Sequence, residues 1–101
     1  MIEILKESEI YVAAVKHFGV VQQKLKTIEE LSELARALAR DLPLDAGEDA
    51  ERNVQEEIAD VEIMLNQMRL LYDPREIDDW KDSKLERLAR MLGVEIEEDD
   101  V

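Results

Sequence analysis

Glycine and proline divide this chain into a few helix-length segments, and this division limits the possible folds more than any other feature. Only three Gly and two Pro occur in 101 residues, and they are Gly19, Pro43, Gly47, Pro74 and Gly93. Between them Ala, Leu, Glu, Lys and Arg dominate, and these residues favour helices. No alternation of polar and apolar residues is long enough to predict a strand. The sequence therefore predicts an all-α chain.

The helix boundaries follow from local signals. Ser8 is the expected cap of the first helix and Gly19 its expected end. The segment Asp73-Pro74-Arg75-Glu76 has the form of a capping box with Pro at the first helical position, which predicts a helix start. The expected helices cover about residues 9–18, 20–41, 49–72 and 74–92.

The length and the short connections predict one compact domain. We expect residues 1–101 to form an antiparallel four-helix bundle with a core over about 9–92 and an acidic, frayed tail over 95–101. A chain of this size buries only roughly two thirds of the surface that its unfolded form exposes. Oligomerisation is therefore expected to complete the core.

The charge balance bears on the possible partners. The chain holds 13 basic and 26 acidic residues, for a net charge of −13. This field repels a phosphate backbone, so we expect no nucleic-acid partner. It can instead concentrate cations. The alternative is a solvated acidic surface with no specific ligand.

Other function classes are excluded by what the chain lacks. It has no Cys, which excludes disulfides, thiolate zinc sites and Cys nucleophiles. Neither an EF-hand spacing nor a Gly-rich phosphate loop is present. The segment Met1 to Glu7 is too short and too acidic for a signal peptide, and no stretch has the length of a membrane span. We therefore expect a cytoplasmic protein without a membrane partner.

Helical projection of the third predicted helix places an acid among apolar residues. Glu57 falls inside the apolar arc of that helix, and Asp60 lies at its border, one turn along. A solvated position therefore fits Glu57 poorly. The apolar arc consists of Val54, Ile58, Val61, Met64, Leu65, Met68 and Leu71.

The second predicted helix repeats this arrangement. Glu30 lies at the edge of the expected core face, and Glu33 lies further round, one turn along. Two facing carboxylate pairs beside apolar surface would repel each other without a cation. Carboxylate oxygens and a single His favour Mg²⁺ or Mn²⁺ over Zn²⁺. The alternative is ordinary surface acids paired with Lys or Arg. The expected core face consists of Leu31, Leu34, Ala35, Leu38 and Leu42.

These residues resemble a known sequence signature. Glu29-Glu30-Leu31-Ser32-Glu33 followed by Glu57-Ile58-Ala59-Asp60 is similar to the EExxE…ExxD signature of the MazG-like, all-α nucleoside triphosphate pyrophosphohydrolases. The segments Gln22–Lys26 and Lys84–Leu88 are also similar to segments of the family, the latter to the basic last helix of short, phage-type members. The resemblance covers about residues 10–92.

The resemblance implies an activity and roles for the acids. Family members cleave a nucleotide between its α- and β-phosphates and release a nucleoside monophosphate and pyrophosphate. By motif position, Glu30, Glu33, Glu57 and Asp60 would bind Mg²⁺, and Glu29 would support these ligands or orient water. Homodimers and homotetramers are common in the family, with the site near a subunit interface.

A phosphorylated substrate also needs cationic and polar contacts. Lys26 lies one turn before Glu30 and could bind phosphate or form a simple i,i+4 ion pair. Lys84 and Arg87 could reach the phosphates from the last helix, or pair with nearby acids. Asn66 could contact the sugar or the base.

Two alternatives remain open at this stage. A dUTP or phosphoribosyl-ATP pyrophosphatase would use a related carboxylate cluster, and the base preference depends on pocket shape. A non-catalytic helical oligomerisation or adaptor module could retain a vestigial metal site or only an acidic groove.

Overall fold

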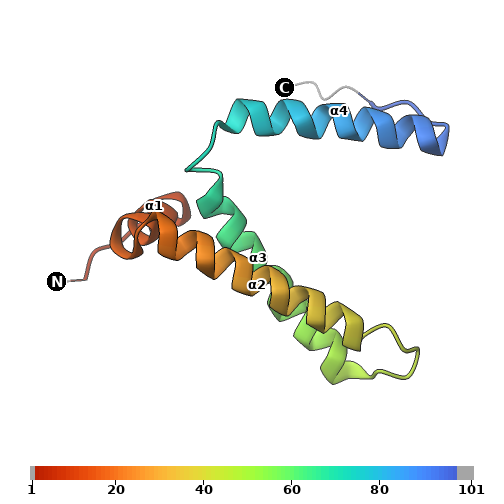
Figure 1. The fold of residues 1–101 in the computed structure, drawn as a ribbon, viewed down its shortest axis with the longest axis horizontal. Helices are drawn as coiled ribbons and strands as arrows, with labels where there is room; N and C mark the ends of the chain where they lie inside the picture. Colours follow the sequence, from red (N-terminus) through yellow and green to blue (C-terminus); the bar gives the residue numbers. More distant parts are fainter. Residues whose placement is uncertain (1, 98–101) are drawn as a thin grey trace. The chain divides into compact units, whose positions relative to one another are not determined.

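The computed structural model describes residues 2–97, and most of these residues are helical (Figure 1). No strand occurs within this described range, so the all-α prediction is confirmed. None of the described helices combines the length and the apolar character that crossing a membrane requires. The helices are α1 (Glu7–Phe18), α2 (Val20–Arg40), α3 (Glu48–Met68) and α4 (Pro74–Leu92).

Several predicted boundary signals act as expected. Gly19, with φ of 91°, separates α1 from α2, and Gly93, with φ of 71°, ends α4. These positive φ angles are readily adopted only by glycine. The Asp73 carboxylate accepts a hydrogen bond from the Arg75 N–H at 2.9 Å, and Pro74 occupies the first turn. The predicted cap of α4 is therefore confirmed.

The predicted cap of the first helix is wrong. The helix begins at Glu7, so Ser8 lies inside its first turn. Lys6 is the residue before the helix, and its backbone N–H donates to the Glu9 carboxylate at 3.1 Å. This backward hydrogen bond satisfies a donor at the helix start, which is the role that Ser8 was expected to fill.

The predicted end of the third helix is also wrong, because α3 stops at Met68 instead of continuing to residue 72. The N–H groups of Leu70 and Leu71 donate to carbonyls three residues back, at 3.1 and 2.9 Å, which tightens the chain into turns. Asp73 then has an extended backbone, with ψ of 111°. A residue before proline disfavours the helical conformation, which accounts for the extended Asp73, whereas the turns at Leu70 and Leu71 end α3 before that point.

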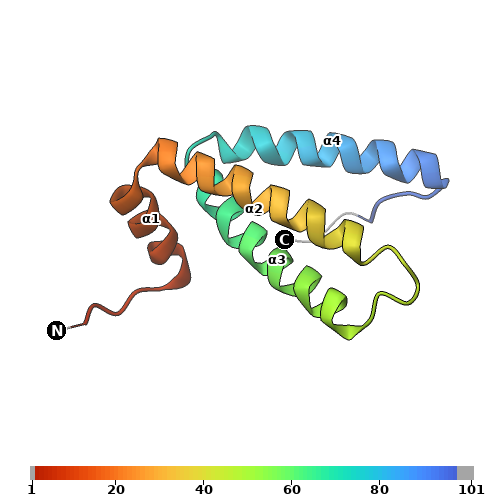
Figure 2. The same ribbon diagram turned by 60° about the horizontal axis from the view of Figure 1, so that its bottom comes forward.

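The chain divides into two compact units, and each is described here by itself. The first ends at Leu71 and contains α1, α2 and α3. In this unit α2 and α3 lie side by side and run in opposite directions, joined by the loop over residues 41–47, and α1 contacts both (Figures 1 and 2). The second begins at Tyr72 and contains α4. There the Val94 N–H donates to the Ala89 carbonyl at 2.9 Å and closes the end of the helix.

The contact between α2 and α3, called the α2–α3 seam below, is unusually polar. Half of its buried side chains carry polar or charged groups. Gln23 and Gln67 join the two helices directly, because the Gln23 Nε2 donates to the Gln67 Oε1 at 2.7 Å. The Thr27 hydroxyl is satisfied within α2 by the Gln23 carbonyl at 2.8 Å. The buried residues of the seam are Gln23, Thr27, Glu30, Ala37, Val54, Val61, Met64 and Gln67.

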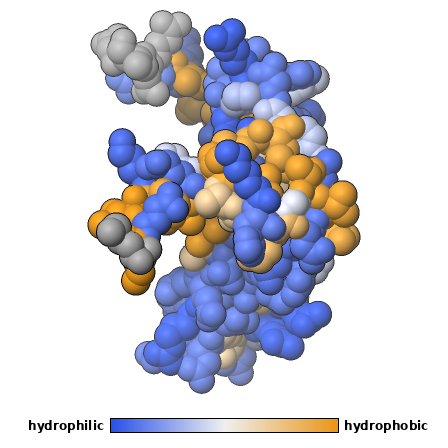
Figure 3. All heavy atoms as spheres, turned by 90° about the vertical axis from the view of Figure 1, so that its left-hand side faces the viewer, coloured by the Kyte–Doolittle hydropathy of each residue, from blue (hydrophilic) through white to orange (hydrophobic). Residues whose placement is uncertain are grey.

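The predicted core face of the second helix is therefore wrong. Of its five residues only Leu34 is half-buried, and the other four are exposed. Residues such as Leu25, Ile28 and Leu31 repeat at helical spacing along this outward stripe, so periodicity alone favoured it as the core. On α3 the prediction is correct for Val54, Val61 and Met64 but wrong for two residues, since Ile58 and Leu65 are exposed. Figure 3 shows that apolar atoms also lie at the surface on the face that it draws.

The glutamine pair of the seam gives a first testable prediction. Gln67→Leu should destabilise the protein by about 1–3 kcal/mol, because the buried Gln23 amide loses its partner. Replacing both residues by Leu should cost much less than the sum of the single changes. Urea unfolding followed by circular dichroism measures all three variants. Additive effects of the two single changes would contradict a direct bond.

Candidate metal centre

The predicted carboxylates meet in the middle of the α2–α3 seam. Carboxylate oxygens of Glu30, Glu57 and Asp60 lie within 4.8 Å of one another, and the same holds for oxygens of Glu29, Glu30 and Glu33. Glu30 belongs to both groups and joins them. The i, i+3 spacing on each helix puts two acids on one side, and the opposite directions of the helices bring the two pairs together. All five predicted acids are therefore neighbours, and we call them the seam carboxylates.

Burial differs sharply among these acids. Glu30 is only 6% exposed, although it was predicted at the edge of an apolar face, while Glu33, Glu57 and Asp60 are half-buried and Glu29 is exposed. The Oε2 atoms of Glu30 and Glu57 are buried and have no hydrogen-bond partner among residues 2–97. A buried carboxylate oxygen without a partner is costly. These two oxygens therefore favour a bound cation over a plain surface role.

The electrostatic environment of Glu57 supports the same conclusion. Its pKa is raised above the usual 4.5, first because burial disfavours the ionised form and then because Glu33, Asp60, Glu30 and Glu56 add negative charge nearby. The folded protein consequently holds the ionised Glu57 less readily than the unfolded chain does. A cation between the carboxylates would reverse this effect.

Lys26 supplies a cation from the chain itself. Its Nζ lies 3.0 Å from the Glu30 Oε1 and 3.8 Å from the Glu29 Oε2. The hydrogen bond to Glu30, followed by the charges of Glu29 and Glu30, raises the pKa of Lys26. The predicted i,i+4 pair is confirmed. One ammonium group cannot neutralise five carboxylates, so most of the negative charge remains available to an ion.

The donor set fits a hard divalent cation. It consists of carboxylate oxygens on two rigid helices, and the two partnerless oxygens belong to opposite helices. Such groups could hold a metal ion between α2 and α3, with Glu30, Glu33, Glu57 and Asp60 as the candidate ligands.

The other predicted contact residues lie outside this cluster or in the other unit. The Asn66 amide donates to the Glu62 carbonyl on its own helix at 2.9 Å and lies beside Tyr11. Lys84 and Arg87 belong to α4 in the second unit, where the Lys84 Nζ lies 6.0 Å from the centre of the Trp80 ring. The roles of Asn66, Lys84 and Arg87 in substrate binding stay predictions.

Two cavities flank the cluster, and neither was predicted. One, of about 280 Å³, is lined by Phe18, Gln22, Gln23, Lys26 and Met64. The other, of about 210 Å³, is lined by Glu33, Arg36, Ala37, Arg40, Asn53 and Glu57. Helical spacing held a signal for the second cavity, because Arg36 and Arg40 follow Glu33 at one-turn and two-turn intervals. Nothing in the sequence alone indicated the first.

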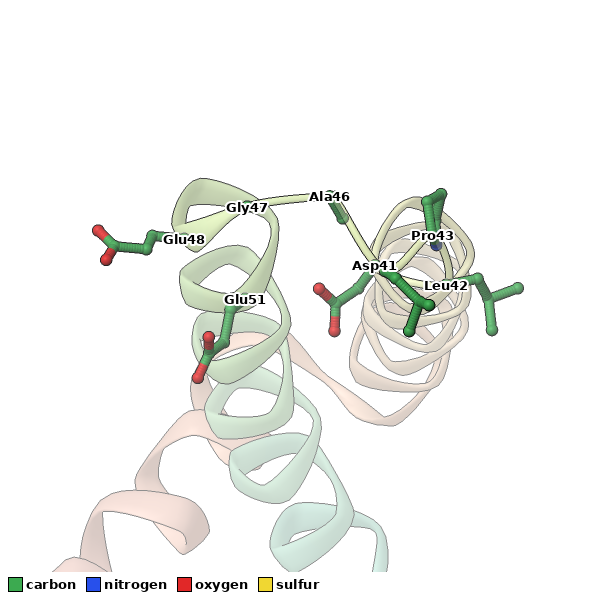
Figure 4. Close-up of a pocket in the computed structure, with 8 residues that line it drawn as sticks. Asp41, Leu42, Pro43, Ala46, Gly47, Glu48 and Glu51 are labelled. Atoms are coloured by element: carbon green, nitrogen blue, oxygen red, sulfur yellow. The ribbon is translucent and has the colours of Figure 1, made fainter.

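A further hollow lies elsewhere, at the loop between α2 and α3 (Figure 4). Its volume is about 420 Å³, and it is lined by residues of the loop, among them Asp41, and by Glu48 and Glu51. The Glu48 side chain points away from the loop in Figure 4. Within residues 2–97 these three acids form no group with converging oxygens. The hollow therefore lacks the chemistry of the seam carboxylates.

Comparison of this chain with protein families, curated proteins and solved structures finds no match. The functional argument therefore depends on the seam carboxylates themselves.

The raised pKa of Glu57 predicts the pH dependence of stability. Between pH 4.5 and the raised pKa the folded state binds more protons than the unfolded state, so this group lowers the free energy of unfolding as pH rises. Glu57→Gln should remove this effect and stabilise the metal-free protein at neutral pH. Urea unfolding with a chelator, at a series of pH values from about 5 to 8, measures the difference between variant and wild type.

The exposed Glu62, also on α3, provides a matched control. Glu62→Gln removes the same charge outside the seam, and its stability difference from wild type should stay small and change little with pH. If the Glu57→Gln protein is no more stable than the Glu62→Gln protein at neutral pH, the ionised Glu57 does not destabilise the fold as predicted.

Proposed function

We propose that the protein is a Mg²⁺-dependent nucleotide pyrophosphohydrolase that cleaves the bond between the α- and β-phosphates of a nucleoside triphosphate. The observation that carries the proposal is the pair of buried, partnerless oxygens of Glu30 and Glu57 within converging carboxylates. The type of reaction is proposed from the similarity of these acids to the EExxE…ExxD signature of MazG-like enzymes. Mn²⁺ is the expected substitute for Mg²⁺, because both ions prefer oxygen ligands.

The residues of the chain have distinct roles in this proposal. Glu30, Glu33, Glu57 and Asp60 would hold the metal, which when bound would neutralise phosphate charge and activate water. Glu29, which is exposed beside this group, would accept a proton from the attacking water or orient it. Lys26 would exchange its contact with Glu30 for one with a phosphate oxygen. Asn66, Lys84 and Arg87 are further candidate substrate contacts.

The proposal includes an oligomer. The outward stripe of α2, with Leu25, Ile28 and Leu31, and the exposed Ile58 and Leu65 of α3 leave apolar surface uncovered. Burial of such surface stabilises association. We expect the four helices to complete an antiparallel bundle and a homodimer or homotetramer to cover the stripe. A cytoplasmic location, favoured by the sequence, is part of the same proposal.

The same exposed stripe favours one second candidate. A helical oligomerisation or adaptor module would use the apolar surface to bind a partner, and its acids would bind metal without turnover. Substrate preference is the other open question, since dUTP or phosphoribosyl-ATP could be the nucleotide cleaved.

A pyrophosphate-release assay tests the activity. The full chain is incubated with Mg²⁺ and each canonical NTP and dNTP, with dUTP and with phosphoribosyl-ATP. Glu30→Gln and Asp60→Asn should each lower turnover by more than about 100-fold, the upper range for losing a group that merely supports a ligand. Glu62→Gln, which removes an exposed charge from α3, should leave turnover near that of the wild type.

Metal binding separates the two candidates. Saturating Mg²⁺ at about 100 times its Kd should stabilise the wild type by about 2.7 kcal/mol, and Glu30→Gln should lose most of this gain. Metal binding without turnover of any nucleotide would favour the adaptor module. Absence of both would refute the metal centre as well as the enzyme.

A further inference from the structure

The polar cavity beside the seam carboxylates contains two arginines at adjacent turns of α2. Arg36 and Arg40 line it together with Glu33, Ala37, Asn53 and Glu57. Because Glu33 and Glu57 belong both to this cavity and to the candidate metal centre, the two sites are continuous. Ala37, which also lines the cavity, is only 1% exposed and has a small side chain.

The two arginines are placed to bind an anion. Both are exposed, and within residues 2–97 neither guanidinium group forms a hydrogen bond or an ion pair. This differs from Arg52, which pairs with Asp49 on α3. A guanidinium group binds phosphate through two parallel hydrogen bonds. Two arginines at i and i+4 can therefore each bind one of two adjacent phosphates. The Asn53 amide adds a neutral donor to the same cavity.

The cavity on the other side of the seam carboxylates has a different character. Met64 is buried there, and Phe18, which is 58% exposed, presents an aromatic ring. Gln23 is fixed by its 2.7 Å hydrogen bond to Gln67, and Gln22 adds a second amide. An aromatic ring can stack on a flat base, and amides can bond its polar edge. These groups suit a nucleobase better than a phosphate chain.

The order of these sites along α2 gives a direction. Gln22 precedes Glu30 by about 12 Å along the helix axis, and Arg36 follows Glu30 by about 9 Å, at 1.5 Å per residue. In a nucleoside triphosphate the base and the two terminal phosphates lie on opposite sides of the α-phosphate. A substrate whose α-phosphate lies at the seam carboxylates therefore has one end at each cavity.

We propose that Arg36 and Arg40 form the subsite for the β- and γ-phosphates, so that the nucleotide lies along the seam with its base in the cavity of Phe18, Gln22 and Met64. This orientation rests on the proposed function for the position of the α-phosphate. The reverse orientation would put the terminal phosphates against Met64 and Phe18, where Lys26 is the one cation lining the described cavity.

Binding of the two products separately tests the orientation. Isothermal titration of the full chain with inorganic pyrophosphate and Mg²⁺, and with each nucleoside monophosphate and Mg²⁺, requires no turnover. Arg36→Gln and Arg40→Gln should each weaken pyrophosphate binding about 10- to 100-fold, as expected for loss of charged hydrogen bonds, with little effect on the monophosphate. Phe18→Ala should weaken the monophosphate and leave pyrophosphate unchanged.

Arg52→Gln is the matched control, because it removes one positive charge from an exposed pair outside both cavities. Its pyrophosphate affinity should stay close to that of the wild type. Circular dichroism checks that each variant keeps its helices. Because Arg36, Arg40 and Phe18 are exposed, their substitution should leave the fold intact.

Three results would overturn the orientation. These are unchanged pyrophosphate binding in both arginine variants, weaker pyrophosphate binding in Phe18→Ala, and no pyrophosphate binding by the wild type. Suppose that the arginine variants lose only pyrophosphate binding and Phe18→Ala loses only monophosphate binding, but that no nucleotide is hydrolysed. This result would refute the proposed activity and support the orientation. Hydrolysis without this separation of the two binding losses would support the activity and refute the orientation.

Discussion

Repulsion between carboxylates in the α2–α3 seam is the constraint on which the rest of this protein depends. A helical hairpin of this size would normally be held together by apolar side chains, yet Glu30 and Glu57 occupy central positions of the contact. Each brings a buried oxygen that no described residue satisfies with a hydrogen bond. Lys26 offsets part of the charge from one side. The carboxylates of the seam therefore lower the stability of the fold locally, and a local loss of stability is typical of a site that binds a ligand.

Local signals predicted the helices well. Gly19, Gly93 and Asp73 mark boundaries through the backbone itself, because positive φ angles and capping hydrogen bonds depend on few neighbours. The same kind of reasoning failed at Ser8, since Glu9 satisfies the helix start from within the first turn. The chain leaves the helix after Met68 through turns at Leu70 and Leu71, and only the extended Asp73 follows from the proline restriction at Pro74.

The grouping of the five acids was predicted more accurately than the core around them. The i, i+3 spacing of the acids is a property of one helix, and it placed Glu30 beside Glu33 and Glu57 beside Asp60 without any knowledge of packing. The choice of packing face was different, because α2 carries two stripes at the same helical period. Hydrophobicity favoured the stripe of Leu31, whereas the hairpin contact uses the stripe of Gln23, Thr27 and Glu30. The flanking cavities depend on residues of separate helices, so single-helix patterns could not define them.

The position of the Gln23–Gln67 bond has a consequence for the tolerance of the chain to changes in length. This bond lies at the opposite end of the hairpin from the loop over residues 41–47, and the seam carboxylates lie between the two. One contact that pairs α2 with α3 therefore lies far from the loop. Loop closure costs only about 0.6 kcal/mol for each doubling of length. We therefore expect the loop to tolerate an inserted peptide tag while Glu30 stays near Asp60.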